Sequence, residues 1–383
     1  MAAGRISRRP WGIVLLMYDD ALIELRRDIH RWPELAGTEQ RTAALVTERL
    51  RAAGLEVTTG VGGHGVVAVL NGDEPGPTVA YRADLDAVPD TETFDSDFRS
   101  RVPGAAHLCG HDIHTTIAVG AAEELRRRRL SRGRVVFIFQ PAEENLTGAH
   151  AMIEDGVLER TAPQEIYALH CAPIPVGTFV VTPGAGLPGQ DHCRILLPPT
   201  GGERIAAAVD ALSTVRPPQT PEQLRQLVQD LATPDGPLSR YVYVQSFADT
   251  DEVRAWWRAW PDDRYPEIRD ELRRLADGAT IEFPAPPFPA MVSSPELSLA
   301  AAEPLRAVGD VVTMPAAYPF NGEDFALFLQ RVPGAMIFLG VANEAAGLHG
   351  ITHAADFGAD ERSIGLGVRA VVGLLTERLA TIA

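Results

Sequence analysis

The stretch Gly133–Glu144, "GRVVFIFQPAEE", runs through valine, phenylalanine and isoleucine and ends in two adjacent glutamates. A short apolar run bounded by glycine and proline is typical of a strand that is buried on both faces of a sheet. Helical patterns flank this strand, with "HTTIAVGAAEELRRRR" (114–129) before it and "TGAHAMIEDGVL" (147–158) after it. The alternation of strands and helices predicts an α/β fold with a doubly wound, mostly parallel sheet.

Polar residues follow several of the apolar runs. The segments "RADLDA" (82–87), "QPAEE" (140–144) and "LHC" (169–171) each stand where a predicted strand ends. In open α/β sheets, ligands bind beyond the carboxyl ends of the strands. The sequence therefore predicts a functional site at this edge of the sheet.

From about residue 187 the chain changes character, because proline-rich breaks separate short apolar segments. Their order predicts a ferredoxin-like β-α-β-β-α-β unit, with an extra helix at 220–232. The proline-rich segment 283–297 then resembles a return linker. We therefore predict a main domain in two parts, 1–186 and 294–383, with a smaller α+β domain inserted at 187–293.

The charge balance excludes two classes of partner. The 383 residues hold 35 Lys plus Arg against 51 Asp plus Glu, a formal net charge of −16. Such a field repels polyanions, so we expect binding to neither nucleic acid nor an anionic membrane surface. Arg126–Arg129 is the exception, and it is predicted to be a solvated helix end.

The cysteines and the N-terminal residues bear on the compartment. Three cysteines make no disulfide framework, which favours a reducing cytoplasm. The N-terminal apolar stretch 12–17 has only six residues and runs into two aspartates. It therefore predicts no secretion signal.

The segment "HLCGHDIHTT" (107–116) holds the first candidate metal ligands. Cys109 and His111 are two residues apart, so both side chains can face one point. Alone this spacing is a weak signal, since a polar loop with a hydrogen-bonded histidine or a thiol nucleophile with its base also fits. Other metal-type residues stand at predicted strand ends or late in the chain: Asp84, Asp86, Glu143, Glu144, His170 and His353. Their convergence would be costly without cations, so the set predicts one or two divalent metals.

Six segments in order resemble the motifs of the M20 metallopeptidase family, in its aminoacylase-like amidohydrolase branch. They are "YRADLDAVPD", "HLCGHDIHTT", "FQPAEENLTGAHAMIEDG", "LHCAPIPVGT", "NGEDFALFLQRVPGAMIFLG" and "HAADFGADE". That branch includes hippurate hydrolase, N-acyl-amino-acid amidohydrolases and auxin-conjugate hydrolases. The resemblance covers residues 20–186 and 294–383, and it implies a zinc-peptidase-like fold in which the inserted domain is a lid.

The resemblance also implies roles for single residues. Five would hold a dinuclear centre of Mn, Zn, Co or Ni, namely Cys109, His111, Glu144, His170 and His353. Glu143 would be the general base and acid for a metal-activated water. Asp86 would hold a ligand histidine in its tautomer. Asp84 lies where related peptidases carry a histidine ligand.

Several residues have an alternative interpretation. His107 and His114 flank the ligand pair, and we expect hydrogen-bonded support rather than ligation. His349 competes with His353 for the last ligand position, and the spacing H-x-x-x-F-x-x-D-E favours His353. Cys171 and Cys193 are predicted to be structural.

The inserted domain departs from the family. Relatives carry a "GGHAA"-type motif whose histidine stabilises the oxyanion, whereas "PPTGGERIAAAV" (198–209) has no histidine. His192 or Arg204 could supply the donor instead. Because this domain builds dimers in relatives, the resemblance implies a homodimer, although this domain is the altered part.

The expected function is metal-dependent hydrolysis of the amide bond in a small N-acyl amino acid or related metabolite. The alternative is a non-catalytic metal- or ligand-binding protein that retains the fold. A thiol hydrolase based on Cys109 is disfavoured, because it explains none of Glu143, Glu144, His170 or His353.

Overall fold

The structure is a computed structural model that describes residues 11–197 and 202–382. The chain divides into two compact units. The first holds residues 1–179, 303–311 and 337–383, and the second holds 180–302 and 312–336. The domain limits expected at 187 and 293 stay a prediction.

The largest sheet has eight strands in the order β1-β2-β4-β3-β5-β14-β6-β13. Their bounds are β1 Glu56–Val61, β2 Gly65–Asn71, β4 Arg132–Gln140, β3 Glu74–Asp84, β5 Glu165–Pro175, β14 Gly334–Ala342, β6 Thr178–Val181 and β13 Asp310–Thr313. β3 pairs in parallel with β4 and with β5, whereas β1, β2 and β4 pair antiparallel. The predicted α/β class with a mostly parallel sheet is confirmed. β1, β6 and β13 were not expected, because β1 and β13 are largely exposed and β6 has only four residues, so each gives little hydrophobic pattern.

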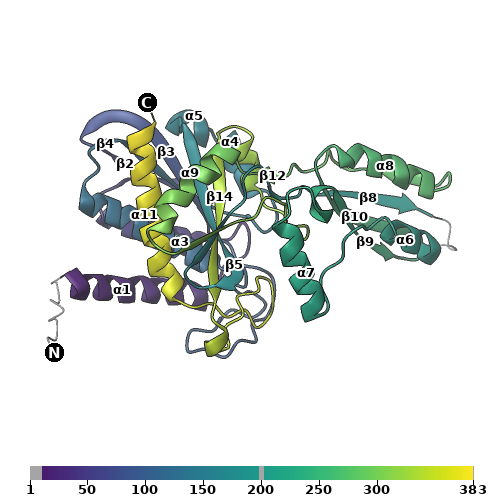
Figure 1. The fold of residues 1–383 in the computed structure, drawn as a ribbon, viewed down its shortest axis with the longest axis horizontal. Coiled ribbons are helices and arrows are strands. Elements are labelled where there is room, and N and C mark those ends of the chain that lie inside the picture. Colours follow the sequence, from purple (N-terminus) through teal and green to yellow (C-terminus); the bar gives the residue numbers. More distant parts are fainter. Residues whose placement is uncertain (1–10, 198–201, 383) are drawn as a thin grey trace, which may run out of the picture. The chain divides into compact units, whose positions relative to one another are not determined.

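Helices pack on the sheet in the first unit. They are α1 Trp11–Arg31, α2 Gln40–Ala52, α3 His111–Arg128, α4 Gly148–Glu154, α5 Val157–Thr161 and α11 Arg362–Thr381, and the short η2 is Glu344–Ala346. α3 and α11 lie side by side against β3, and α1 contacts both (Figure 1). α2 contacts β1 and β2. Arg126–Arg129 is exposed at the end of α3, as predicted.

One predicted helix is wrong. The pattern at 147–158 was expected to form a single helix, but α4 ends at Glu154 and α5 begins at Val157. Between them Gly156 adopts φ 78°, a left-handed conformation that ends an α-helix.

The second unit contains the ferredoxin-like fold. Its elements are β8 Asp191–Leu196, α6 Gly202–Asp210, α7 Pro221–Leu231, η1 Pro237–Ser239, β9 Tyr241–Ala248, β10 Glu252–Trp260, α8 Arg264–Leu275 and β11 Thr280–Glu282. The strand order β11-β8-β10-β9 is that of a β-α-β-β-α-β unit, and α6 and α8 contact its sheet (Figure 1). α7 is the extra helix, as expected. Trp257 and Cys193 are buried in the core of this sheet.

The same unit has a short ribbon and two further helices that begin in it. β7 Gly186–Leu187 pairs with β12 Met291–Val292, and the helices are α9 Pro295–Arg306 and α10 Phe325–Leu329. Among the residues described in both units, no helix is both long and apolar enough to cross a membrane. The arginines of the N-terminal segment, Arg5, Arg8 and Arg9, lie outside the described residues.

Candidate metal centre

The strand register brings the predicted site residues to one edge of the sheet. In the parallel pair of β3 and β4, Asp84 stands opposite Gln140, the last residue of each strand. The segments that follow, with Asp86 and Glu143, therefore leave the sheet at the same edge. His170 lies on β5, the other neighbour of β3.

Gly110 allows the first turn of α3 to approach β5. It is the N-cap of α3 with φ 90°, a left-handed conformation that favours glycine. A Cβ atom at Gly110 would lie 2.7 Å from Sγ of Cys171. The close approach of "CGH" to β5 therefore requires glycine here.

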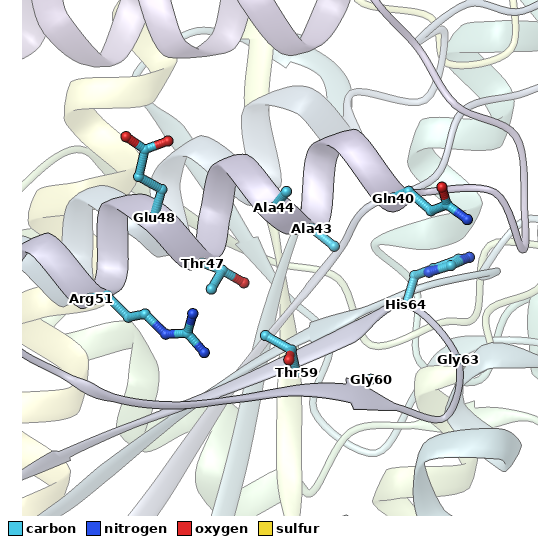
Figure 2. Close-up of a pocket in the computed structure, with 10 residues that line it drawn as sticks. All are labelled: Gln40, Ala43, Ala44, Thr47, Glu48, Arg51, Thr59, Gly60, Gly63 and His64. Carbon is cyan, nitrogen blue, oxygen red and sulfur yellow. The ribbon is translucent and has the colours of Figure 1, made fainter.

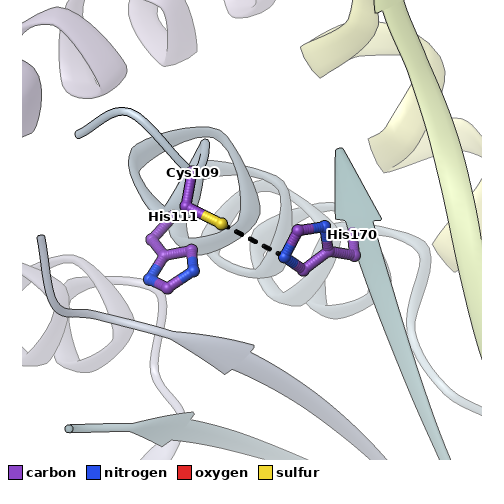
Figure 3. Close-up of side chains that lie close together, drawn as sticks. All are labelled: Cys109, His111 and His170. Atoms are coloured by element: carbon purple, nitrogen blue, oxygen red, sulfur yellow. Dashed lines mark hydrogen bonds between the residues drawn. The ribbon is translucent and has the colours of Figure 1, made fainter. Parts of the chain in front are cut away.

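Three predicted ligands face one another in Figure 3. The Sγ atom of Cys109 lies 3.4 Å from Nε2 of His170. Nδ1 of His170 donates to the carbonyl oxygen of Cys171 at 2.8 Å, which leaves Nε2 with its lone pair toward Cys109. Metal-binding histidines use this arrangement, in which the second ring nitrogen donates to a backbone carbonyl.

His111 is oriented in the same way. Its Nδ1 lies 2.9 Å from the backbone carbonyl oxygen of Asp86. Its Nε2 is buried and has no hydrogen-bond partner within the described part of the chain. A buried nitrogen lone pair without a partner is costly unless a cation takes it.

The two glutamates lie next to this nitrogen. Oε1 of Glu144 is 3.6 Å from Nε2 of His111, and Oε2 of Glu143 is 3.8 Å from the same atom. The other oxygen of Glu144 lies 3.6 Å from Nε2 of His353. Glu144 thus stands between two imidazoles, where its two carboxylate oxygens could serve as metal ligands.

His353 completes the group. It adopts φ 62°, and its backbone N–H donates to the carbonyl oxygen of Leu108 at 2.8 Å. Ligand atoms of Cys109, Glu144 and His353 lie within 4.8 Å of one another, as do those of Cys109, His111 and His170. The structure therefore brings all five predicted ligands together.

His349, the competitor of His353, has other partners. Its Nε2 lies 3.2 Å from Oδ1 of Asp356. Its Nδ1 accepts a hydrogen bond from the backbone N–H of Ile351 at 3.0 Å. Both ring nitrogens are engaged, which supports the choice of His353.

Asp86 contacts the site through both its backbone and its side chain. Its carbonyl is the nearest acceptor for His111, while its Oδ1 lies 3.4 Å from the same ring nitrogen. Oδ2 accepts the backbone N–H of Glu144 at 2.9 Å. The carboxylate thus positions Glu144 as well as the histidine, a second role that the sequence did not indicate.

Asp84 and His114 form a support behind the ligands. Nδ1 of His114 donates to Oδ1 of Asp84 at 2.7 Å, and its Nε2 accepts the backbone N–H of Cys171 at 2.8 Å. Oδ2 of Asp84 accepts from Arg82 at 2.6 Å. With both ring nitrogens in use, His114 is held as a support. Burial would raise the pKa of Asp84, but the nearby His111 ring, the hydrogen bond from His114 and the Arg82 guanidinium hold it well below the usual range.

The electrostatics fit a cation. Burial, together with repulsion from Asp86 and Asp84, raises the pKa of Glu144 to about 7. Burial opposes protonation of His111, but nearby carboxylates outweigh it and raise its pKa to about 10. Without a metal, Glu144 and His111 therefore hold protons more tightly than usual, because several carboxylates lie close together. Divalent metals displace protons from ligands of this kind.

The same surroundings argue against a thiol nucleophile. Burial and the charges of Glu144 and Glu143 raise the pKa of the Cys109 thiol well above its usual range. A nucleophilic thiolate needs a lowered pKa. A thiolate that binds a cation avoids this cost.

A polar network that the sequence did not reveal ties α1 to the first turn of α3. Oδ2 of Asp112 contacts Nδ1 of His30 at 2.8 Å and Nε of Arg26 at 2.6 Å. Nε2 of His30 lies 3.1 Å from Glu92. His107 is also buried there, and burial lowers its pKa to about 3. Neither of its ring nitrogens has a hydrogen-bond partner among the described residues, so the expectation of hydrogen-bonded support is wrong for His107. His30 and Asp112 are 82 residues apart, so no local pattern joins them.

The loop that carries the two glutamates is strained. Ala142 and Leu146 adopt φ 52° and 59°, which costs an L-residue roughly 1–2 kcal/mol each. The loop closes on itself, because the N–H of Leu146 donates to the carbonyl of Glu143 at 2.7 Å and that of Gly148 to the carbonyl of Ala142 at 3.0 Å. Strain of this kind is typical of functional sites.

A separate hollow of about 580 Å³ lies between α2 and the β1–β2 turn. Figure 2 shows Gln40 and His64 at one end and Arg51 at the other. Its lining, as far as the described residues show, includes none of the predicted site residues. Size alone therefore does not locate the chemistry.

Comparisons with known proteins agree with this geometry. Residues 80–377 match the group described as peptidase family M20/M25/M40. The chain is 33% identical over 377 residues to thermostable carboxypeptidase 1 of Saccharolobus solfataricus, covering 92% of this chain and 94% of that one. It is 32% identical over 339 residues to N-acetylcysteine deacetylase of Bacillus subtilis, covering 83% and 88%.

A solved structure is also similar. A Bacillus subtilis protein described as a dinuclear metal binding peptidase from the M20 family matches with a TM-score of 0.74 and 28% identity. The match covers 96% of this chain and 100% of that one.

Proposed function

The chain belongs to peptidase family M20/M25/M40, and from this premise we propose that it is a metal-dependent amidohydrolase acting on small N-acyl amino acids or related N-acyl metabolites. One observation carries the proposal. Five ligand-type side chains converge at the sheet edge, and Glu143 lies beside them with Oε2 at 3.8 Å from Nε2 of His111.

The names of relatives support the substrate class. One is an N-acetylcysteine deacetylase and another a carboxypeptidase. Both kinds of enzyme cleave an amide whose leaving amine belongs to an amino acid. A small N-acyl amino acid is the simplest substrate with that bond.

We further propose that the centre holds two divalent metals. Their ligands would be Cys109, His111, Glu144, His170 and His353. The donors fit, because Nε2 of His111 and Oε1 of Glu144 are buried with no hydrogen-bond partner among the residues described. When bound, such ions polarise a carbonyl and lower the pKa of water from about 16 toward roughly 7. Mn, Zn, Co and Ni all accept this mixed donor set.

Glu143 would move the proton. Its carboxylate is 5% exposed, so it lies at the site rather than in bulk solvent. It would take a proton from the attacking water and deliver it to the leaving amine, as a general base and then an acid. Asp86 would hold His111 and the backbone of Glu144 in place through the two contacts described above.

The histidine-free segment of the inserted domain favours the alternative function. Its first residues, 198–201, lie outside the described residues, and the rest begins α6. His192 and Arg204, the alternative donors, are both exposed. Since one lost oxyanion donor costs about 100-fold to 1,000-fold in rate, a non-catalytic metal-binding protein is the alternative.

Metal analysis and substrate screening separate these functions. N-acetyl and N-aroyl amino acids would be tested with added Mn²⁺, Zn²⁺ or Co²⁺ against wild type, Glu143→Ala and the control Glu154→Ala, an exposed glutamate on α4. We expect turnover in wild type and control and none in Glu143→Ala. Metal uptake without turnover of any amide would favour the binding protein, and no metal uptake would contradict both. A homodimer and a cytoplasmic location stay predictions, the first testable by light scattering.

A further inference from the structure

Glu39 is a buried carboxylate that the function above does not use. It is 0% exposed and stands directly before α2, at the N-cap position. Its side chain does not cap that helix within the described residues. Instead, Oε1 accepts the backbone N–H of Gly37 at 2.8 Å and that of Ala142, 103 residues away, also at 2.8 Å.

Ala142 is the residue that sets the direction of Glu143. It adopts φ 52° immediately before the proposed general base. Its carbonyl oxygen accepts from Gly148, inside the same loop. The hydrogen bond from the Ala142 N–H to Glu39 differs from this one, because it connects the loop to the N-cap residue of α2, which lies outside the loop.

The loop needs such a tie. A non-glycine residue keeps a left-handed φ only where its surroundings hold it there. Gly148 packs so closely on Pro141 that a Cβ atom would lie 1.6 Å from the Pro141 carbonyl oxygen. Contacts within the loop thus hold Gly148 against Pro141. The hydrogen bond to Glu39 connects the turn at Ala142 to the start of α2.

We propose that Glu39 is a positioning residue that fixes the turn at Ala142 and so directs the carboxylate of Glu143. This inference rests on the proposed function, because it takes Glu143 as the general base. Glu39 acts through the backbone and touches no reacting atom. Its second oxygen, Oε2, has no hydrogen-bond partner in the described part of the chain, so one acceptor atom is what the position requires.

The chain offers a matched control. Glu34 accepts the backbone N–H groups of Arg41 and Thr42 at 2.9 and 2.8 Å, at the start of the same helix. Glu34→Ala therefore weakens the start of α2 without removing the bond to Ala142. Glu39→Ala removes that bond, while Glu39→Gln keeps an acceptor oxygen.

The test uses the full-length, metal-loaded protein. For each variant we would measure kcat and KM on the best N-acyl amino acid, Tm, and hydrogen exchange of the peptide containing residues 141–147. We expect Glu39→Ala to lower kcat about tenfold to 100-fold with little change in KM, since a small misplacement of a catalytic group is that costly. In Glu39→Ala the backbone amide of Ala142 should exchange hydrogen faster than in wild type. Glu39→Gln should recover most of kcat, and Glu34→Ala should lower Tm without changing kcat.

A second variant keeps the test informative if Glu39→Ala folds poorly. Ala142→Gly removes the penalty of the left-handed φ, so it should restore Tm in the Glu39→Ala background but leave kcat low. Equal losses of kcat in Glu34→Ala and Glu39→Ala would overturn the inference, as would wild-type kcat in Glu39→Ala. If wild type hydrolyses no amide, the proposed function fails separately. The exchange measurement then still decides, and unchanged protection of Ala142 in Glu39→Ala overturns the tie itself.

Discussion

Nδ1 of His111 lies 2.9 Å from the backbone carbonyl oxygen of Asp86, and this contact determines how the ring is used. The N–H at Nδ1 donates to the carbonyl, so Nε2 faces Glu143 and Glu144 and is the nitrogen left for a proton or a metal. A backbone acceptor cannot be removed by changing a side chain. The tautomer of His111 is therefore more robust than the position of Glu144, which depends on the Asp86 carboxylate.

The first prediction concerns Asp86. Asp86→Ala keeps the backbone contact to His111 but loses the bond from the Glu144 N–H to Oδ2. We expect metal affinity to fall about tenfold to 100-fold, the usual effect of losing a residue that orients a ligand. Calorimetric titration of the metal-free protein measures this. Asp90→Ala, which removes an exposed aspartate nearby, should leave affinity unchanged, and wild-type affinity in Asp86→Ala would contradict the role.

The second prediction separates a support from a ligand. His114→Ala leaves the N–H of Cys171 and an oxygen of Asp84 buried without their partners. Each such loss costs about 1–3 kcal/mol, so stability to urea should fall by several kcal/mol. Metal stoichiometry should stay that of wild type, whereas His170→Ala should lower it. Loss of a metal in His114→Ala, measured by elemental analysis, would show that His114 is a ligand instead.

The third prediction uses two glycines with left-handed φ. Gly110→Ala combines the strain of φ 90° with an overlap between the added Cβ and Cys171. Gly104→Ala adds only the strain of φ 74°, because beyond its two neighbours no atom of the described chain lies within 4 Å of the added Cβ. We expect Gly104→Ala to cost roughly 1–2 kcal/mol. The overlap in Gly110→Ala should add about 1–3 kcal/mol and weaken metal binding. Equal free energies of unfolding in the two variants would show that β5 moves aside without cost.

The fourth prediction concerns pH and metal removal. In the chelated protein the pKa values of Glu144 and His111 are raised to about 7 and about 10. A raised folded-state pKa means that the folded protein binds more protons than the unfolded chain, so stability falls as pH rises through that window. We therefore expect the Tm of chelated protein to fall as pH rises from about 5 toward 10.

Metal binding should oppose this trend. Ions bind the deprotonated ligands, and saturation at 1,000-fold excess over Kd stabilises the folded state by about 4 kcal/mol. The gain in Tm on adding metal should therefore grow with pH across the same range. A gain that is equal at pH 5 and pH 8, measured by scanning calorimetry, would contradict a site built on these two residues.

Much of the fold follows from local pattern. The valine-rich runs of β2, β3 and β4, the helices between them and the order of elements in the inserted unit are all visible as periodicity, because burial of one face repeats at a fixed interval. Among the ligands, Glu144 is visible for a similar reason, since it follows soon after the apolar strand β4. The break at Gly156 and the short exposed strand β1 were missed, because both depend on single residues or on weak burial.

The contacts that hold the candidate site in place belong to tertiary structure. His30 meets Asp112 across 82 residues, His111 meets Asp86 across 25, and Glu39 meets Ala142 across 103. The sequence, with the family resemblance that it carries, is enough to predict that cysteine, histidine and glutamate ligands gather at one edge of the sheet. It cannot show which ring nitrogen of His111 is left for a cation or that both nitrogens of His114 are used. Those outcomes depend on strand register and on the crossing of helices over the sheet, which place hydrogen-bonding atoms to within a few tenths of an ångström and leave no periodic trace in the chain.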